Sequence, residues 1–591
     1  MFSSTPVDPD RMTRALRSLR NRGPDGEGVW WTEDRQVGLG HRRLAINGTD
    51  NSAQPLIGDR FVTSLNGEFY DLPESYRNRT DSLALPDALE RHPVEQALSS
   101  LTGEFAGLVY DRLERRLLAV RDRFGVKPLY WGYRQEELWL ASKPSALWAA
   151  GVKPGWCERG FAQAGATQYP LPGRTSFAGV SSLKPGHYLQ IEGAKLREKV
   201  YWRVPMPSPE SRPVDLGEEL EKAVLRRLRR GHKNAVLLSG GIDSAAVAAL
   251  AARSEEEVTA YTVDFTEPTH RDFSESSQAV AQSSLCGLPH RILKLTANEL
   301  LEDLPQAVKA LEGIVVNGHA VAKWRLSRAI REDGCKVVLS GEGADELLYG
   351  YSHFAPYFVK KVTPPVGPVD RDAHAQRACA VKPPVGPVGL GILTTRASAA
   401  PLPDDWPIFF HTKYYLGRKI AAFLSLPLHP LSAFKSILNT LEPATSRETA
   451  RQAWLQTALT SYILETLSDG AEMAHSVEGR PPFLDHKLWE RVAATPIRDG
   501  NKTLLRHAMS DLVVPEIVTK PKHPFMAGPL GEPLLREAER VISDSRHPFV
   551  SRKRSQKILR RLRQARAQER LEWEPALVWL LSSYYLQELW T

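Results

Sequence analysis

Apolar runs that end in glycine-rich turns recur in the second half of the chain. Residues 235–238 (AVLL) and 337–339 (VVL) each lead into a turn of serine and glycine, and residues 258–265 form a third run of strand type. Stretches of helical composition, such as 216–229 and 242–249, alternate with these runs. The alternation predicts a doubly wound parallel α/β sheet whose ligand lies at the carboxyl ends of its strands.

The first part of the chain follows a different pattern. Residues 1–203 contain short strand-type segments separated by glycine and asparagine turns, with few long helical patterns. A polar, proline-rich segment, residues 204–215, follows and has the composition of a stiff linker. We therefore predict a β-rich domain over 1–203 and a separate α/β domain over 216–591.

Length, composition and charge agree with a globular protein of two or more domains. A chain of 591 residues with 42% hydrophobic and 25% charged residues is typical of a soluble globular protein. The net charge of +8 is mild, so it fits an anionic substrate such as ATP without requiring nucleic acid. The four cysteines lie far apart without zinc spacing, which indicates reduced thiols in a cytoplasmic protein. Neither an export signal nor a membrane-spanning stretch is evident, so we expect no membrane partner.

The turn after the first apolar run, residues 239–244, reads SGGIDS. A strand followed by a glycine turn and a helix N-terminus presents backbone N–H groups and the positive end of a helix dipole to a phosphate. Two adjacent glycines let the backbone approach the anion closely. The turn has neither the lysine of GxxxxGK[ST] nor the spacing of GxGxxG, and an ordinary βα turn is the alternative interpretation.

A second turn, after residues 337–339, is rich in carboxylates. Glu342, Asp345 and Glu346 follow the strand closely and would repel one another unless a cation lies near them. Asp243 of the first turn and Asp345 could together hold Mg²⁺, which prefers oxygen ligands and bridges ATP phosphates. A solvated acidic loop is the alternative interpretation.

Four phrases, in this order, resemble the synthetase domain of class B asparagine synthetases. SGGIDS resembles the pyrophosphate loop SGGxDS of ATP pyrophosphatases, and residues 339–346 (LSGEGADE) resemble the family's LSGEGxDE element. Residues 469–485 resemble DRxSMAxSVExRxPFLD, and 502–525 form the fourth phrase. The resemblance implies an ATP-pyrophosphatase-like domain that uses ATP and Mg²⁺ to adenylate a carboxylate. AMP and pyrophosphate leave, and ammonia or an amine attacks the acyl-adenylate.

The resemblance also implies roles for individual residues. Contact with ATP or pyrophosphate is implied for Leu237, Ser239, Gly240, Gly241, Asp243, Ser244, Val263, Ser340 and Gly341. Val263 would pack on adenine, and an apolar core position is the alternative. Glu342 would take a proton from the attacking amine, whereas β-lactam synthetases place a tyrosine there. Lys522 would stabilise charge on the α-phosphate and the leaving pyrophosphate, with a surface lysine as the alternative.

The third phrase departs from the family's pattern at two positions. Gly470 stands in place of arginine and Glu472 in place of serine, which puts the chemistry of the substrate pocket in question. Glu478 and Arg480, in the same phrase, are expected to form a structural ion pair.

Residues 1–203 resemble the glutaminase domain of the same family, an Ntn-type β-sandwich. The resemblance rests on phrases such as RNRGPDGEG (20–28) and LNGEFYD (65–71), and it places Arg43, Asn66 and Glu68 where the family binds glutamine. The family's N-terminal nucleophile is a cysteine, but residue 2 is phenylalanine, and the short first strand that carries the cysteine is expected to be absent. Either the domain is retained without glutaminase activity, or an upstream start encodes the cysteine.

Two further segments are distinctive. Residues 354–414 contain PPVGPV twice, and this density of proline excludes regular helix or central strand, which leaves a surface insertion or a lid. Residues 551–570 are densely basic with an apolar stripe, which predicts a solvated basic helix. The run has no aromatic side chains for base stacking, so docking of an acidic partner is the remaining alternative.

We predict an ATP-dependent carbon–nitrogen ligase, with a small-molecule or peptide carboxylate and an ammonia or amine donor as its partners. One hypothesis is the conversion of aspartate to asparagine. A second is amide formation in a specialised metabolite, or the closure of a peptide as in lasso-peptide cyclases, which also lack the cysteine. A non-catalytic ATP-binding scaffold is the alternative of another class, and a homodimer is compatible with each.

Overall fold

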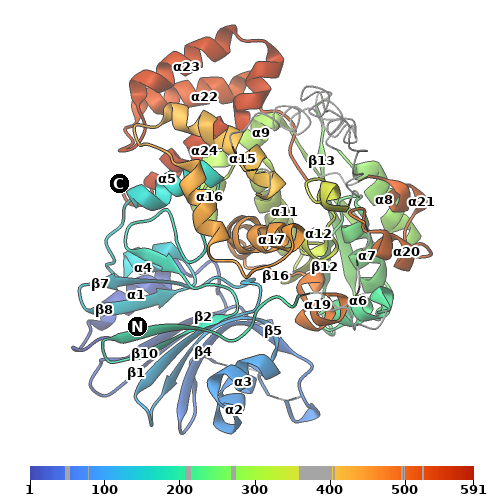
Figure 1. The fold of residues 1–591 in the computed structure, drawn as a ribbon. Helices are drawn as coiled ribbons and strands as arrows, with labels where there is room; N and C mark the ends of the chain where they lie inside the picture. The colour runs from blue at the N-terminus through green and yellow to red at the C-terminus, as the bar shows by residue number, and fades with distance from the viewer. Residues whose placement is uncertain are drawn as a thin grey trace, which may run out of the picture.

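The computed structural model shows a β-rich N-terminal part beside a larger α/β part (Figure 1). The structure describes residues 1–46, 53–76, 79–206, 214–267, 274–358, 402–403, 406–493, 495, 497, 499–521 and 525–591. The predicted insertion at 354–414 and the predicted phosphate-binding residue Lys522 lie largely or wholly outside this part of the chain.

The N-terminal part is a sandwich of antiparallel sheets. Its main sheet has six strands, in the spatial order β11 (Lys195–Val200), β10 (His187–Glu192), β6 (Arg116–Arg121), β5 (Thr102–Asp111), β4 (Phe61–Tyr70) and β3 (Leu56–Ile57). Two smaller sheets pair β1 (Gly26–Trp31) with β2 (Gly38–Arg43), and β7 (Tyr130–Arg134) with β8 (Glu137–Ala141) and β9 (Val180–Ser182). These sheets confirm the predicted glutaminase-like β-sandwich.

Alternation along the strands gives the main sheet two apolar faces. On β4, Val62 packs with Leu39 and Leu138 of the small sheets, whereas Leu65 packs with the helices on the opposite face. Those helices are α2 (Ala84–Arg91) and α3 (Val94–Ser100), while α1 (Pro9–Ser18) and α4 (Pro144–Ala149) pack on each other beside the small sheets (Figure 1). Phe2 makes single bridges to Val37 and Leu138, so the expectation that the first residues lack strand pairing is only partly correct.

The C-terminal part is built on five parallel strands. Their order is β14 (His290–Leu295), β13 (Val258–Phe265), β12 (Asn234–Leu237), β15 (Val337–Leu339) and β16 (Glu478–Arg480). Four helices pack on the two faces of this sheet: α6 (Leu216–Leu225), α7 (Ile242–Ala251), α8 (Ser276–Leu285) and α11 (His319–Glu332). The strand order changes direction between β12 and β15, the position at which doubly wound sheets open a crevice for ligands.

Both faces of this sheet are buried, as the unbroken apolar runs predict. On β12, Val236 packs toward α6 and α7, whereas Ala235 faces the other layer, which includes α11. All ten residues of α7 are buried, which explains why its sequence is alanine-rich and has no polar face.

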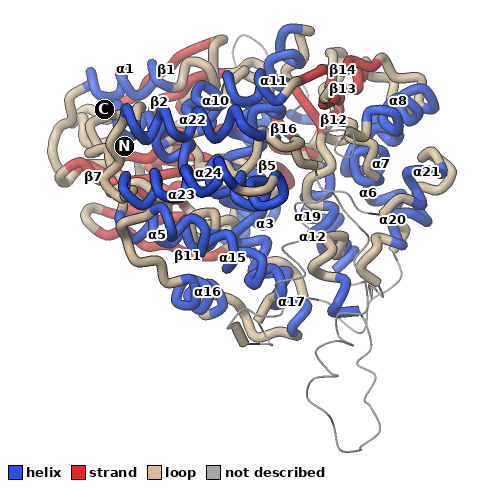
Figure 2. The backbone as a smooth tube through the Cα atoms, turned by 90° about the horizontal axis from the view of Figure 1, so that it is seen from above, coloured by secondary structure: helices blue, strands red, loops and turns tan. Residues whose placement is uncertain are grey.

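Further helices complete the molecule. The last ones in the chain cover the end that contains the C-terminus, whereas others pack beside α6 and α7 (Figures 1 and 2). They are α9 (Ala297–Glu302), α10 (Leu304–Leu311), α12 (Ala344–Leu348), α15 (Ile408–Phe423), α16 (Pro430–Leu438), α17 (Ser446–Trp454), the π-helix η6 (Leu455–Gly470), α18 (Ala471–Met473), α19 (His486–Ala493), α20 (Thr503–Ala508), α21 (Pro515–Thr519), α22 (Gly531–Asp544), α23 (Arg552–Gln564) and α24 (Ala567–Gln587), together with α5 (Glu158–Thr167) of the first domain. Within the described residues, none of the helices combines the length and apolarity needed to cross a bilayer.

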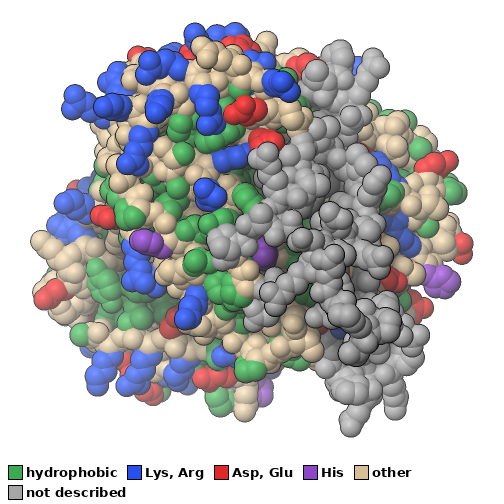
Figure 3. Space-filling model, turned by 45° about the horizontal axis from the view of Figure 1, so that its top comes forward, with side chains coloured by type: hydrophobic (Ala, Val, Ile, Leu, Met, Phe, Trp, Pro, Cys, Tyr) green, Lys and Arg blue, Asp and Glu red, His purple; other side chains and the backbone are tan. Residues whose placement is uncertain are grey.

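The basic run at 551–570 is not one helix, as predicted, but two. The helix α23 ends at Gln564, and α24 begins two residues after Ala565, because Ala565 and Arg566 adopt extended backbone. The predicted apolar stripe is real, since Leu559 and Leu562 are buried. Lys and Arg side chains gather at the top of Figure 3, the end at which Figure 1 places α22 and α23.

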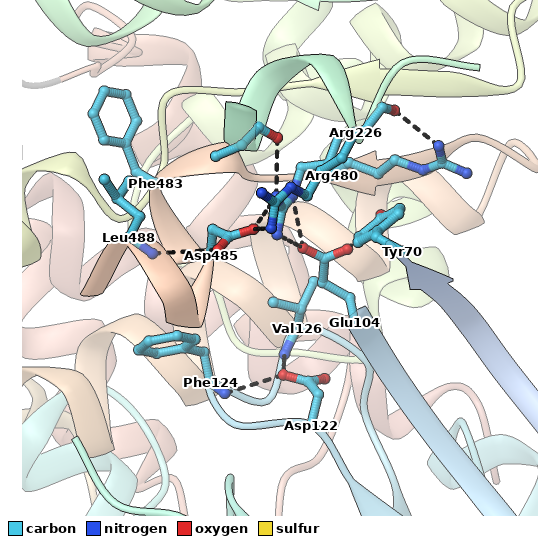
Figure 4. Close-up of polar contacts among 12 residues, drawn as sticks. Tyr70, Glu104, Asp122, Phe124, Val126, Arg226, Arg480, Phe483, Asp485 and Leu488 are labelled. Carbon is cyan, nitrogen blue, oxygen red and sulfur yellow. Dashed lines mark hydrogen bonds and ion pairs between the residues drawn. The ribbon is translucent and has the colours of Figure 1, made fainter. Parts of the chain in front are cut away.

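Buried ion pairs join the two parts of the molecule. The guanidinium of Arg227, which follows α6, lies 2.6 Å from Glu104 of β5 and 2.7 Å from Asp485, and all three side chains are less than 5% exposed. Figure 4 shows Glu104 and Asp485 turned toward the same point between the domains. Arg22 and Asp469 form a second such pair, with two hydrogen bonds of 2.5 and 3.0 Å.

We expect Arg227→Met to lower the free energy of unfolding by about 3–5 kcal/mol, because it leaves two buried carboxylates without their cation. Urea denaturation measures this loss. Arg253→Met is the matched control, since Arg253 pairs with Glu221 on the surface and should change stability by less than about 0.5 kcal/mol. Equal effects of the two variants would show that the pair does not hold the domains together.

Candidate active site at the ends of β12 and β15

The loop after β12 is closed on itself at the start of α7. Ser239 donates its backbone N–H to Ser244 Oγ at 3.1 Å, and Ser244 Oγ donates to the carbonyl of Gly241 at 3.1 Å. Gly240 has φ +73°, and a Cβ there would lie 2.7 Å from the carbonyl oxygen of Glu275. The turn therefore needs glycine, and it leaves the first N–H groups of α7 available for an anion.

The loop after β15 packs directly on the first loop. A Cβ on Gly341 would lie 2.9 Å from Cβ of Asp243 and 3.0 Å from the backbone nitrogen of Ser244. The second loop thus needs glycine where the two loops touch. The parallel pairing of β12 with β15 brings both strand ends to this point, and Asp243 and Asp345 come together across it.

The two aspartates converge on a lysine that the sequence did not single out. Lys502 Nζ lies 2.6 Å from both carboxylate oxygens of Asp243 and 2.6 Å from Oδ1 of Asp345, and its side chain is 2% exposed. Lys502 precedes α20 and has φ +56°, a backbone conformation that costs a residue with a side chain about 1–3 kcal/mol. A Cβ on Gly350 would lie 1.8 Å from Cε of Lys502, so Gly350 provides the space for this side chain.

The pair of aspartates fits a magnesium site completed by phosphate oxygens. The structure holds the two carboxylates close enough to share one ammonium ion, and Mg²⁺ commonly uses one or two carboxylates together with substrate phosphates. Within the described residues no group of three or more acidic, histidine or cysteine side chains could hold a metal by itself. Asp243 and Asp345 therefore remain the predicted ligands.

A cavity of about 30 Å³ opens beside the first loop. Its lining includes Gly240, Gly241, Asp243, Glu275, Gly350, Lys502, Arg506 and Lys520. Lys520 is paired with Glu275 at 2.5 Å. The lining therefore holds three cationic side chains beside the N-terminus of α7: Lys502, Arg506 and Lys520. This arrangement suits the polyphosphate of a nucleotide.

Glu342 lies on the other side of the second loop. It accepts hydrogen bonds from Lys323 Nζ at 2.5 Å and Ser468 Oγ at 3.1 Å, and a further one from Ser340. Burial by itself would raise the pKa of Glu342, but the ammonium of Lys323 and the hydrogen bonds from the two serines together outweigh burial, and the net shift is downward. Glu342 is therefore ionised at neutral pH and can accept a proton.

The other predicted nucleotide contacts lie around the same strand ends. Leu237 is the last residue of β12, and Ser340 follows β15 directly. Val263 lies on β13, is 8% exposed and belongs to the apolar core, so both of its predicted environments remain compatible with its position. Glu478 and Arg480 form the predicted ion pair at 2.9 Å, and Arg480 also contacts Glu68 of the N-terminal domain.

A second cavity, of about 180 Å³, lies in the N-terminal domain. Arg43, Asn66 and Glu68, the residues predicted to bind glutamine, all line it. Asp81 lines it as well and was not singled out, because it lies outside the phrase 65–71 and only the fold brings it there. Burial raises the pKa of Asp81 to about 6.

Two protein families and several known proteins are similar to this chain. The family described as asparagine synthase matches residues 215–590, and the glutamine amidotransferase domain matches residues 2–202. "Amidase chry2" of Gibberella zeae is 27% identical over 90% of this chain and 88% of its own length, and "Amidase chyE" of Penicillium rubens is 28% identical over 90% and 87%. "Asparagine synthetase [glutamine-hydrolyzing] 1" of Bacillus subtilis is 26% identical over 88% and 84%. The chain is therefore an enzyme of ATP-dependent amide synthesis and belongs to the asparagine synthase family.

Proposed function

We propose that this enzyme adenylates a substrate carboxylate with ATP at the ends of β12 and β15, releases AMP and pyrophosphate, and passes the acyl group to ammonia or an amine. The observation that carries the proposal is the convergence of Asp243 and Asp345 on Lys502 beside a glycine turn at a helix N-terminus. Charges of both signs are held there in the arrangement that a nucleotide polyphosphate and its cation require.

The residues divide the work between two ends of the site. The loop of residues 239–244 would bind the β- and γ-phosphates through its N–H groups, and Lys502 and Lys520 would neutralise the leaving pyrophosphate. When bound by Asp243 and Asp345, Mg²⁺ would neutralise phosphate charge during departure of pyrophosphate. Lys522, adjacent in sequence to this cavity, would add a further cation at the α-phosphate.

Glu342 would act at the acyl end of the site. The amine must lose a proton as it attacks the acyl-adenylate, and Glu342 is an ionised carboxylate on the loop that adjoins the phosphate site. We propose the domain boundaries of 1–203 for the glutaminase-like part and 216–591 for the synthetase part, with 204–215 between them.

A polypeptide of residues 1–591 should not use glutamine as its nitrogen donor. Residue 2 is phenylalanine, and no cysteine is among the residues that line the 180 Å³ cavity of the described N-terminal domain. Pyrophosphate release by the purified chain should therefore respond to aspartate with ammonium chloride and not to aspartate with glutamine. Glutaminase activity of this same chain would contradict the expectation.

A second candidate function follows from the third phrase. Glu472 replaces the serine of the family's pattern, and the structure pairs it with Lys323 at 3.3 Å beside Glu342. The pocket next to the predicted base is thus more charged than the resemblance implies, which favours a carboxylate or amine other than aspartate and ammonia. If aspartate does not support pyrophosphate release, a member of a panel of amino acid, aromatic and peptide carboxylates should support it. A protein that binds ATP but releases no pyrophosphate with any of them would favour the non-catalytic ATP-binding scaffold.

A further inference from the structure

Behind Glu342 lies a second carboxylate that shares the same lysine. Lys323 Nζ is 2.5 Å from Oε1 of Glu342, 2.8 Å from Oγ of Ser468 and 3.3 Å from Oε1 of Glu472. The three charged groups come from different elements. Lys323 lies on α11, Glu342 follows β15, and Glu472 lies on α18.

The exposure of the three side chains falls from Glu342 through Lys323 to Glu472. The side chain of Glu342 is 22% exposed, that of Lys323 is 8% exposed, and that of Glu472 is 2% exposed. Only Glu342 can therefore meet a substrate, and the other two act on the reaction through it.

Gly479 leaves the space that the carboxylate of Glu472 occupies. A Cβ on Gly479 would lie 1.9 Å from Oε2 of Glu472 and 2.7 Å from its Cδ, so a side chain at 479 would force this carboxylate to move. A cavity of about 10 Å³, close to the space that one water molecule needs, is lined by Glu342, Glu472, Ser468, Lys127 and Gly479, among others.

A single structural ion pair does not account for this arrangement. Lys323 already has a partner in Glu342, and burial of a second carboxylate against the same ammonium adds a desolvation cost that a single ion pair avoids. Two carboxylates in unequal surroundings are instead the usual means of separating proton affinities. Burial raises the pKa of Glu472 to about 7, whereas Lys323 holds that of Glu342 below its ordinary value.

We propose that Lys323 and Glu472 are positioning residues that carry the amine's proton away from Glu342, and this proposal rests on the function proposed above. The N–H bond of the attacking amine breaks as an O–H bond forms on Glu342. A proton on Lys323 Nζ moves to Glu472, and the proton on Glu342 moves to Nζ. Glu342 is then a carboxylate and Lys323 an ammonium again, while Glu472 holds the proton until it is released through the adjoining cavity.

The relay fixes the direction of the pH dependence. Glu472 accepts a proton only in its ionised form, so amide formation should rise through a pKa of about 7 and level off above it. Burial is the main cause of this pKa, and three charged groups that face Glu472 modify it: Lys323 from α11, Glu342 from the loop after β15, and Lys127 from the N-terminal domain. Lys127 lies between β6 and β7, and its ammonium is also 3.5 Å from Glu478 of β16.

The first test needs no substrate. Infrared difference spectra of the full-length enzyme between pH 5.5 and 8.5 should show the carbonyl stretch of a protonated carboxylic acid that titrates near neutrality. Burial also raises the pKa values of Asp81, Glu346 and Glu574 to between about 6 and about 7, so Glu472→Gln should remove one component of this absorption and leave theirs. Glu302→Gln, at an exposed residue of α9, should remove none. An unchanged titration in Glu472→Gln would overturn the relay.

The second test uses the carboxylate that supports pyrophosphate release in the assay above, with hydroxylamine as the amine. Glu472→Gln and Lys323→Met should each lower amide formation about tenfold or more at pH 8, and the limb near pH 7 should vanish in Glu472→Gln. Carboxylate-dependent exchange of pyrophosphate into ATP precedes amine attack and should stay within about twofold. If the wild-type enzyme shows no exchange, the proposed function is refuted. If Glu472→Gln shows normal exchange and an unchanged pH profile of amide formation, only the relay is refuted.

A rescue experiment guards against misfolding. Gly479→Ala should lower amide formation, because its Cβ displaces Glu472. In an enzyme that already carries Glu472→Ala the same change should have little further effect, since the displaced carboxylate is gone. Additive losses in the double variant would show that Gly479 does not act through Glu472.

Discussion

Methionine in place of Lys502 should lower pyrophosphate release from MgATP by about a hundredfold or more, the loss that follows removal of one charge-stabilising group from an active site. Lys502 Nζ is the cation between Asp243 and Asp345, and it lines the cavity of about 30 Å³ that we propose for the polyphosphate. Methionine has a similar length but no charge. The free energy of unfolding should fall by about 3–5 kcal/mol as well, because two buried carboxylates lose their shared partner.

The control for this variant is Lys487→Met, which removes a half-exposed lysine paired with Asp71. It should leave pyrophosphate release unchanged and shift stability by less than about 1 kcal/mol. Magnesium distinguishes the structural role of Lys502 from its role in the reaction. In Lys502→Met the carboxylates of Asp243 and Asp345 are no longer paired with an ammonium and can bind Mg²⁺, so Mg²⁺ should raise the Tm of this variant by more than that of the wild type. Wild-type activity in Lys502→Met would remove Lys502 from the site.

Sequence reasoning located the two loops because their signals are local. An apolar run, a glycine turn and a helix start within about fifteen residues specify a strand, a turn and an anion site, and both loops carry all three. The doubly wound topology followed from the alternation of runs, and the parallel pairing of β12 with β15 confirms it. The meeting of Asp243 with Asp345 could be predicted for the same reason, because parallel strands end at one edge.

Lys502 could not be found in this way. Its partner Asp243 is 259 positions away, and its side chain reaches the site only because residue 502 adopts φ +56° and Gly350 leaves space for it. Nothing in the phrase KTLLRH distinguishes this lysine from a surface residue. Lys323 was missed for a similar reason, since it lies in a helix with several other basic side chains and is identified only by its contact with Glu342.

The departure at Glu472 shows the limit of reading a pattern position by position. The sequence marked the residue as unusual but gave no role, because its meaning depends on Lys323 and on the absence of a Cβ at Gly479. Gly479 is close to Glu472 in the chain, but Lys323 is far from both, and only the fold brings the three together. The prediction of one helix over 551–570 was wrong for a different reason. Charge and hydrophobic periodicity do not indicate the extended backbone at Ala565, where the first helix ends.

Glutamine in place of Glu342 should abolish amide formation, by a factor of about 10²–10⁴, and leave carboxylate-dependent exchange of pyrophosphate into ATP in place. The change keeps the shape of the side chain but removes the oxygen that takes the amine's proton, and adenylation is complete before that step. Exchange of labelled pyrophosphate and formation of the hydroxamate measure the two steps separately. Glu332→Gln, an exposed carboxylate at the end of α11, is the matched control and should change neither.

The pH profile decides which carboxylate limits the reaction. The pKa of Glu342 lies below its ordinary value, so Glu342 is ionised across the neutral range and cannot produce a limb near pH 7. A limb that survives in Glu342→Asp but disappears in Glu472→Gln therefore belongs to the buried carboxylate. If Glu342→Gln instead retains full amide formation, neither Glu342 nor Glu472 takes the amine's proton. The ion pairs of both carboxylates with Lys323 then serve only to join α11, α18 and the loop after β15.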